Sequence, residues 1–150
     1  MSKSADGTWQ RASRLSAGHW NALLKAVWLL ARARIDHRLK PIKVVLQRFE
    51  KDGSHTEATA AEIELVAWAI KSAASRVPWR SDCLLQAMAG SMWLNEIDRS
   101  CKLNIGVRKN AAGELEAHAW LTSGDLVVTG KLPDLEAFSP IPLASGISRF

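Results

Sequence analysis

The segment CKLNIGVRKNAAGELEAHAWLTSGDLVVT, residues 101–129, decides the fold class because its apolar residues follow the period of a β-strand. Leu103, Ile105 and Val107 alternate with other residues, so one face of this strand is apolar. The tetrapeptide NAAG and the tripeptide SGD have the composition of turns. The segment therefore predicts three antiparallel strands, over residues 101–109, 114–122 and 126–129.

Helical spacing replaces this alternation upstream of residue 98. Ser16 is a candidate cap for a first helix, and Pro41 interrupts that helix because proline lacks the N–H that a continuing helix needs. The apolar residues at helical spacing in this helix are Trp20, Leu23, Leu24, Val27, Leu30 and Ile35. Residues 41–50, PIKVVLQRFE, predict a short second helix, with a strand as the alternative.

Two more helices are expected before the strands. Thr59 and Glu62 form a T-x-x-E capping box at the start of one helix, which ends near Val77–Pro78. The apolar stripe of this helix consists of Ile63, Val66, Ala67, Ile70 and Ala74. Ser81 is the candidate cap of the next helix, roughly residues 82–96, whose inward-facing residues are Leu84, Leu85, Met88 and Met92. Helices followed by an antiparallel sheet predict an α+β domain.

Length and charge bound the kind of protein. The chain has 150 residues, enough for one domain with a real core. Its net charge of +5 is uneven, because residues 1–50 carry ten Lys and Arg against three Asp and Glu. A basic N-terminal part suits nucleic acid, an anionic membrane surface or an acidic protein partner, and a solvated helix face is the simpler alternative.

Several functional classes find no support in the sequence. No apolar run is long enough for a membrane span, and the N-terminus lacks the apolar stretch of a signal peptide, so we expect a cytoplasmic protein with both cysteines reduced. The four histidines are scattered without metal-ligand spacing, and no glycine-rich phosphate loop occurs. We therefore expect no metal, no cofactor and no ATP. No zinc finger or aromatic-stacking motif indicates nucleic-acid binding.

Cys83 is the first candidate for chemistry, since it lies at the predicted start of a helix in RSDCLLQAM, residues 80–88. The positive end of a helix favours a thiolate, the reactive form of cysteine. A free backbone N–H at the same place can stabilise an oxyanion when the thiolate attacks a carbonyl. The alternative is a buried cysteine that only packs. Cys101, the other thiol, starts a strand and is expected to be structural.

His118 is the second candidate. It lies in the middle of a predicted strand, between the small residues Ala117 and Ala119, which leave space beside the imidazole. A lone histidine is more often structural than catalytic. A cysteine and a histidine brought together by the fold, however, form a recurrent nucleophile and base pair.

These residues carry a resemblance to a known family. CLLQAMAGSMWL, LNIGVRKNAAGELEAHAWL and GDLVVTG, over roughly residues 60–142, resemble the transglutaminase-like B protein of lasso-peptide biosynthesis. The ordered set Cys-Leu, Gly-Val and His-Ala-Trp carries the likeness. It implies a papain-like cysteine peptidase in which Cys83 is the nucleophile, His118 the base and Trp120 an aromatic that packs behind the histidine.

The resemblance also implies a biological setting. Such a peptidase removes the leader from a precursor peptide, and a separate ATP-dependent cyclase closes the macrolactam. The helical N-terminal part favours the stand-alone form, which needs a separate leader-recognition protein. The basic N-terminal half, including Arg32, Arg34 and Arg38, is a candidate docking surface for that protein or for an acidic leader. The implied division is a single domain with a flexible lead-in over 1–15, a helical part over 16–58, a catalytic core over 59–142 and a tail over 143–150.

The third member of the site departs from the family pattern. The family commonly has an aspartate twelve residues after the histidine, where this chain has Gly130. A Ser-Gly turn that pairs Thr122 with Asp125 and His118 with Thr129 places Asp125 roughly 13 Å from the imidazole, too far for a hydrogen bond. Asp134, Thr129 or a backbone carbonyl are the remaining candidates, with Asp134 as the tentative third member. The missing aspartate keeps a non-catalytic peptide-binding module open as an alternative. An acyltransferase is a further, weaker alternative, because transfer to an amine and hydrolysis share the thioester intermediate.

Overall fold

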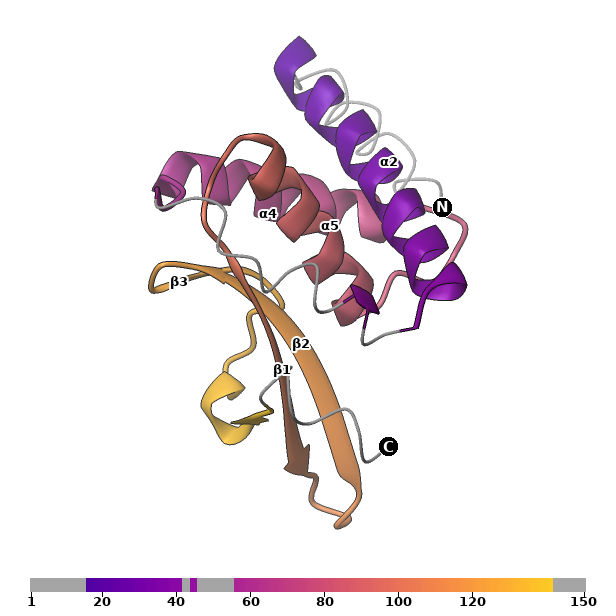
Figure 1. Cartoon of the computed structure of the whole chain (residues 1–150), viewed down its shortest axis with the longest axis vertical. Helices are drawn as coiled ribbons and strands as arrows, with labels where there is room; N and C mark the ends of the chain where they lie inside the picture. Colours follow the sequence, from indigo (N-terminus) through magenta and orange to yellow (C-terminus); the bar gives the residue numbers. More distant parts are fainter. Residues whose placement is uncertain (1–15, 42–43, 46–55, 142–150) are drawn as a thin grey trace, which may run out of the picture.

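The computed structural model describes residues 16–41, 44–45 and 56–141 of the chain. These residues form three α-helices followed by a four-stranded antiparallel sheet (Figure 1), which confirms the predicted α+β class. The expected lead-in over 1–15 and the tail over 143–150 lie outside the described residues, as does most of the element predicted over 41–50. No helix among the described residues is both long and apolar enough to cross a bilayer.

Helix α2 spans Ala17–Leu39, and its two ends agree with the sequence. The Ser16 hydroxyl accepts a hydrogen bond from the His19 N–H, and Lys40 follows the last turn directly before Pro41. The buried side differs from the stripe predicted from the sequence, except at Leu30, which belongs to both. The buried residues are Ala22, Ala26, Leu29, Leu30 and Ala33. Alanines face α4 and α5 because small side chains let the three helices approach closely.

Helix α4 spans Ala60–Ala74 and opens with the predicted capping box, in which Thr59 and Glu62 bond each other's backbone N–H. The Glu62 carboxylate also pairs with Arg99, whose Nε lies 3.0 Å from Oε2. Arg99 and the Thr59 N–H together hold the pKa of Glu62 below its ordinary value. The pair ties the start of α4 to the segment that leads into the sheet. The helix ends at Ala74, earlier than the proline alone suggested.

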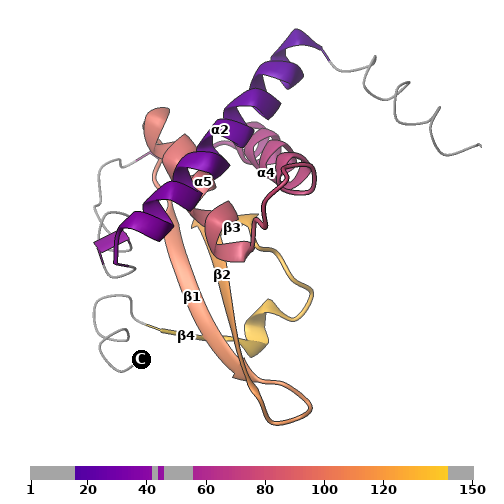
Figure 2. The ribbon, with the colours of Figure 1, turned by 90° about the vertical axis from the view of Figure 1, so that its right-hand side faces the viewer.

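Helix α5, Cys83–Glu96, contacts both α2 and the sheet. Small and apolar residues all around the helix are almost fully buried, among them Ala87, Met88, Ala89 and Leu94. Leu85 and Met88 are buried as predicted, while Leu84 and Met92 are only half-buried. Figure 2 shows α5 between α2 and the strands, so it is the element that joins the two layers.

The sheet has the order β3-β2-β1-β4, with all pairs antiparallel. Its strands are β1 at Lys102–Lys109, β2 at Leu115–Ser123, β3 at Leu126–Thr129 and β4 at Ser139–Pro140. The first three agree with the prediction, whereas β4 is a two-residue strand without a sequence signal. The turn between β1 and β2 lies at the end of the sheet remote from the helices (Figure 1).

The register between β2 and β3 corrects the sequence prediction. Ser123 pairs with Leu126, so the two turn residues are Gly124 and Asp125, one position later than expected. Gly124 has φ +57°, a left-handed conformation that glycine adopts without strain. A register shift then places Thr129 opposite Leu121. The predicted pairings of Thr122 with Asp125 and of His118 with Thr129 are therefore wrong.

Candidate active site

Cys83 is the first residue of α5. The cap of the helix is Asp82, whose Oδ1 accepts a hydrogen bond from the Leu85 N–H at 3.2 Å. The predicted cap, Ser81, is wrong by one residue. Its hydroxyl is buried without a partner in the described structure, and its carbonyl accepts a hydrogen bond from Gln86. Because the helix begins one residue later than expected, the Cys83 N–H belongs to the first turn and has no acceptor within the helix.

The imidazole of His118 is held from one edge. Its Nε2 lies 2.7 Å from the carbonyl oxygen of Gly130. A carbonyl can only accept, so Nε2 carries the proton in this bond. In the neutral ring, Nδ1 is then left with a lone pair. The hydrogen bond therefore fixes both the ring orientation and the nitrogen that can take up a proton.

Two aromatic rings hold the imidazole face. Trp120, two residues along β2, stacks on His118 with ring centroids 6.1 Å apart and an interplanar angle of 15°. Phe138 lies against His118 at 5.4 Å. Gly106, the partner of His118 on β1, is required here, because a Cβ would stand 2.9 Å from the Trp120 ring. The glycine of the IGV segment thus makes room for the indole that packs on the candidate base.

Gly130 has a geometry that excludes a side chain. Its φ is +80°, and a Cβ would stand 2.6 Å from the carbonyl oxygen of Ala119 and 2.9 Å from Cβ of Trp120. An aspartate at this position is incompatible with the observed backbone. The backbone carbonyl of the same residue occupies the hydrogen-bonding place beside His118 that the missing carboxylate was expected to fill.

Asp134 and Thr129 are the two side-chain candidates for the third member of the site, and in the described structure neither side chain is hydrogen-bonded to His118. The Asp134 carboxylate is bound by Arg108, which holds the pKa of Asp134 below its usual value, and His118 adds a smaller Coulombic attraction. Its catalytic role stays a prediction. The Thr129 hydroxyl is buried without a partner in the described part of the chain.

Cys83 and His118 line the same cavity, of about 650 Å³. Helices α4 and α5 form one side of it, and β3 with the segment after it forms the other. Most of its remaining lining is small or apolar, including Ala67, Ala74, Val127, Val128 and Leu132. The charged side chains on its wall are Lys71 and Lys131, both exposed. The fold thus brings together two residues that are 35 positions apart in the chain.

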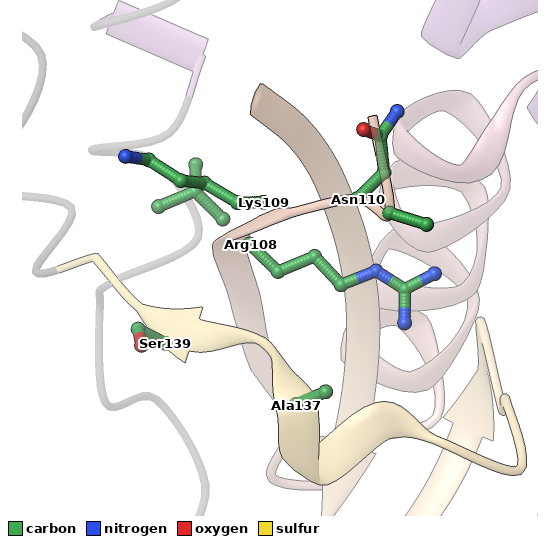
Figure 3. A pocket seen from close by; sticks show the side chains of 7 residues that line it. Arg108, Lys109, Asn110, Ala137 and Ser139 are labelled. Carbon is green, nitrogen blue, oxygen red and sulfur yellow. The ribbon is translucent and has the colours of Figure 1, made fainter. Parts of the chain in front are cut away.

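A second cavity, of about 490 Å³, lies at the far end of the sheet. Figure 3 shows Arg108, Asn110, Ala137 and Ser139 around it, with Lys109 directed to the side opposite Arg108. It contains neither cysteine nor histidine, so it offers no nucleophile and base pair.

Cys101 differs from Cys83 in its surroundings. Its Sγ lies 3.5 Å from the Ser91 hydroxyl, and burial raises the pKa of the Cys101 thiol. A raised pKa leaves less thiolate near neutral pH, which fits the predicted structural role. Among the described residues, no group of three or more His, Cys, Asp and Glu side chains is arranged to hold a metal ion.

A helix-start cysteine, a strand histidine and an antiparallel sheet behind them define a class of protein. A family model described as the transglutaminase-like superfamily matches residues 24–142. Because this match covers most of the chain, the protein belongs to the transglutaminase-like superfamily, which includes cysteine hydrolases and acyltransferases. Neither the curated proteins nor the solved structures contain a significant match.

Proposed function

We propose that this protein is a cysteine peptidase that removes the leader from a lasso-peptide precursor. The observation that carries the proposal is that Cys83 and His118 line the same cavity. The Gly130 carbonyl accepts a hydrogen bond from Nε2 of His118, so Nδ1 is the nitrogen that can act as the base. The family-like segments in the sequence supply the substrate class, which no part of the geometry specifies.

The reaction follows from these groups. Nδ1 of His118 takes the Cys83 proton, and the thiolate attacks the carbonyl carbon of the scissile peptide bond. The Cys83 N–H donates to the resulting oxyanion. The imidazolium then gives its proton to the leaving amine, and a thioester joins the leader to Cys83. Water, deprotonated by His118, attacks the thioester, and the returned proton restores the thiol.

The proposal includes three partners. The precursor peptide is the substrate, a separate leader-recognition protein holds the leader, and an ATP-dependent cyclase uses the released core. The small apolar lining of the cavity suits a side chain without charge beside the scissile bond. The two lysines on its wall favour an acidic residue nearby in the substrate.

Replacement of Cys83 by alanine tests the proposal, with Cys101→Ala as the matched control. We expect Cys83→Ala to abolish cleavage of the cognate precursor, followed by mass spectrometry, because no nucleophile remains. We expect Cys101→Ala to retain cleavage, because the Cys101 thiol contacts the Ser91 hydroxyl and does not line the cavity that contains His118. Cleavage by Cys83→Ala at the wild-type rate would exclude the mechanism.

The alternative is a peptide-binding module without catalysis, which the absent carboxylate at Gly130 favours. Labelling by iodoacetamide near pH 7 separates the two functions. A peptidase has a Cys83 thiol that reacts at least about tenfold faster than Cys101, because Cys83 lines the cavity whereas burial raises the pKa of the Cys101 thiol. Equally slow labelling of both thiols supports the binding module. The mass of the product distinguishes hydrolysis from transfer to an amine.

A further inference from the structure

Helix α2 is apolar on two opposite faces. The inner face is packed on α4 and α5, while the outer face exposes five large apolar side chains. These are Trp20, Leu24, Trp28, Ile35 and Leu39, with exposed fractions between 46% and 76%. At 3.6 residues per turn they fall within a sector of roughly 100°, opposite the buried alanines, and span about 29 Å. We call these five residues the α2 stripe.

Such a stripe is unusual for a surface that only meets water. Isolated exposed apolar residues are common, but a contiguous row with two tryptophans marks an interaction site. Tryptophan and arginine are also the residues enriched where protein interfaces gain most of their binding energy. Arg32 adds to this pattern, because its guanidinium lies 5.5 Å from the centre of the Trp28 ring.

Cations border the stripe. Arg32 lies beyond one edge of it, Arg34 lies beyond the other edge, and Arg38 lies at that second edge in line with Trp20. Within the described part of the chain, no carboxylate pairs with any of these three arginines. The helix's own acid, Asp36, binds Lys40. The outer face of α2 therefore offers apolar contact together with positive charge that has no carboxylate partner among the described residues, which calls for a ligand with apolar groups and carboxylates.

A second copy of the chain is a poor match for this face. Two α2 stripes packed against each other bring only cations to their borders, which repel at short range. Residues 1–15 are an equally poor match, since they carry Lys3, Arg11 and Arg14 against one acid, Asp6. Charge complementarity thus points to a different molecule.

A bilayer is also less suitable than a protein. Polar Asn21 and charged Arg38 fall within the same sector as the stripe, so insertion into acyl chains would bury an amide and a guanidinium without partners. The small Ala31 also breaks the row of large side chains between Trp28 and Ile35. A row of unequal heights suits the interlocking side chains of a packed helix.

We propose that the α2 stripe is the docking site for an amphipathic helix of a separate protein, with apolar residues along its contact line and carboxylates on both sides. Figures 1 and 2 show α2 on the side of α4 and α5 away from the strands. A partner bound there leaves the Cys83 cavity open to substrate. The proposal does not require that Cys83 be a nucleophile, so it stands or falls independently of the proposed activity.

The test uses the full chain and two synthetic 21-residue amphipathic helices with the same leucine contact line. One peptide has glutamates beside that line, and the other has lysines. We expect calorimetry to show that the acidic peptide binds at least about tenfold more tightly than the basic one, and more weakly at high salt. Leu24→Ala and Arg32→Glu each weaken this binding by about fivefold or more.

Leu115→Ala is the matched control, because Leu115 has a similar exposed fraction, 59%, but lies on β2. It leaves binding of the acidic peptide unchanged. Absence of binding, equal binding of both peptides, or equal effects of Leu24→Ala and Leu115→Ala overturn the proposal. Two further results also overturn it: flotation with phosphatidylserine vesicles that Leu24→Ala abolishes, and a dimer in light scattering that Leu24→Ala converts to a monomer.

Discussion

Replacement of Gly130 by alanine tests whether the backbone at this position orients the candidate base. The structure gives the substitution two separate costs. An L-residue at φ +80° lies in the left-handed region, which costs about 1–2 kcal/mol. The new Cβ also stands 2.6 Å from the Ala119 carbonyl oxygen, and overpacking of this kind typically costs about 1–3 kcal/mol. We expect the free energy of unfolding to fall by about 2–5 kcal/mol.

Relief of the clash has a consequence for the site. The backbone must move away from Ala119 and Trp120, and the Gly130 carbonyl moves with it. Its 2.7 Å hydrogen bond to His118 is then lost or lengthened. A displacement of about 1 Å in a catalytic group can lower the rate roughly 100-fold. We therefore expect the folded variant to cleave the precursor about 100-fold more slowly.

Gly113→Ala is the control for this experiment. Gly113 has the same φ, +80°, but a Cβ there meets nothing within 4 Å, so only the conformational cost of about 1–2 kcal/mol remains. Urea unfolding measures stability, and cleavage is measured where each variant is fully folded. Equal losses of stability for the two variants, with an unchanged cleavage rate for Gly130→Ala, refute the reasoning. Gly130→Asp is expected to behave like Gly130→Ala, although it supplies the carboxylate common in the family.

Three further predictions follow from other contacts. Gly106→Ala places a Cβ 2.9 Å from the Trp120 ring. We expect thermal unfolding to show that the free energy of unfolding falls by about 1–3 kcal/mol, and we expect slower cleavage. A variant as stable as the wild type would contradict the packing described. Glu62→Gln keeps the capping box but removes the charge that Arg99 stabilises. Because the pKa of Glu62 is lowered in the folded state, its charge stabilises the fold above the unfolded pKa, and this stabilisation is lost as the pH falls below about 4.3. We therefore expect the free energy of unfolding in urea to depend less on pH in this range for the variant than for the wild type. Lys131→Glu should lower kcat/KM about fivefold for a peptide with glutamate beside the scissile bond, corresponding to roughly 1 kcal/mol, and leave the glutamine analogue unchanged; equal effects on both peptides exclude a charge preference.

The strands were readable from the sequence because apolar residue types alternate along it, as Leu103, Ile105 and Val107 do in β1. β1, β2 and β3 coincide with the predicted segments to within one residue at each end. β4 was not predictable. Ser139–Pro140 pairs with Gly106 and Val107, and a two-residue strand has no period to detect.

The buried face of α2 could not be predicted from spacing alone. Trp20 and Leu24 recur with helical periodicity, and so do Ala22 and Ala26, but of these four residues only the two alanines are buried. Periodicity identifies an apolar face without indicating which of two faces is internal. The distance between packed helices determines which face of α2 is internal, and that distance is a property of the whole fold.

The candidate site likewise combines features that the sequence predicts with features that depend on the whole fold. Cys83 and His118 were identified from their positions on a helix start and a strand, and their catalytic roles remain predictions. Asp82 and Ser81 are adjacent residues of equal capping ability, so only the path of the chain decides between them. A backbone carbonyl was among the candidates, but the sequence did not indicate which one, because a backbone acceptor does not depend on residue identity.

That carbonyl changes what can disable the site. A carboxylate loses its charge in acid, whereas a backbone carbonyl carries no titratable proton and accepts the His118 hydrogen bond at any pH. An asparagine or aspartate in a triad is also lost by a single side-chain change, but every amino acid brings a carbonyl. The orientation of the imidazole therefore depends on the backbone conformation around Gly130 and not on a side chain. A search for a third side chain would count this site as incomplete when its hydrogen bonding is intact.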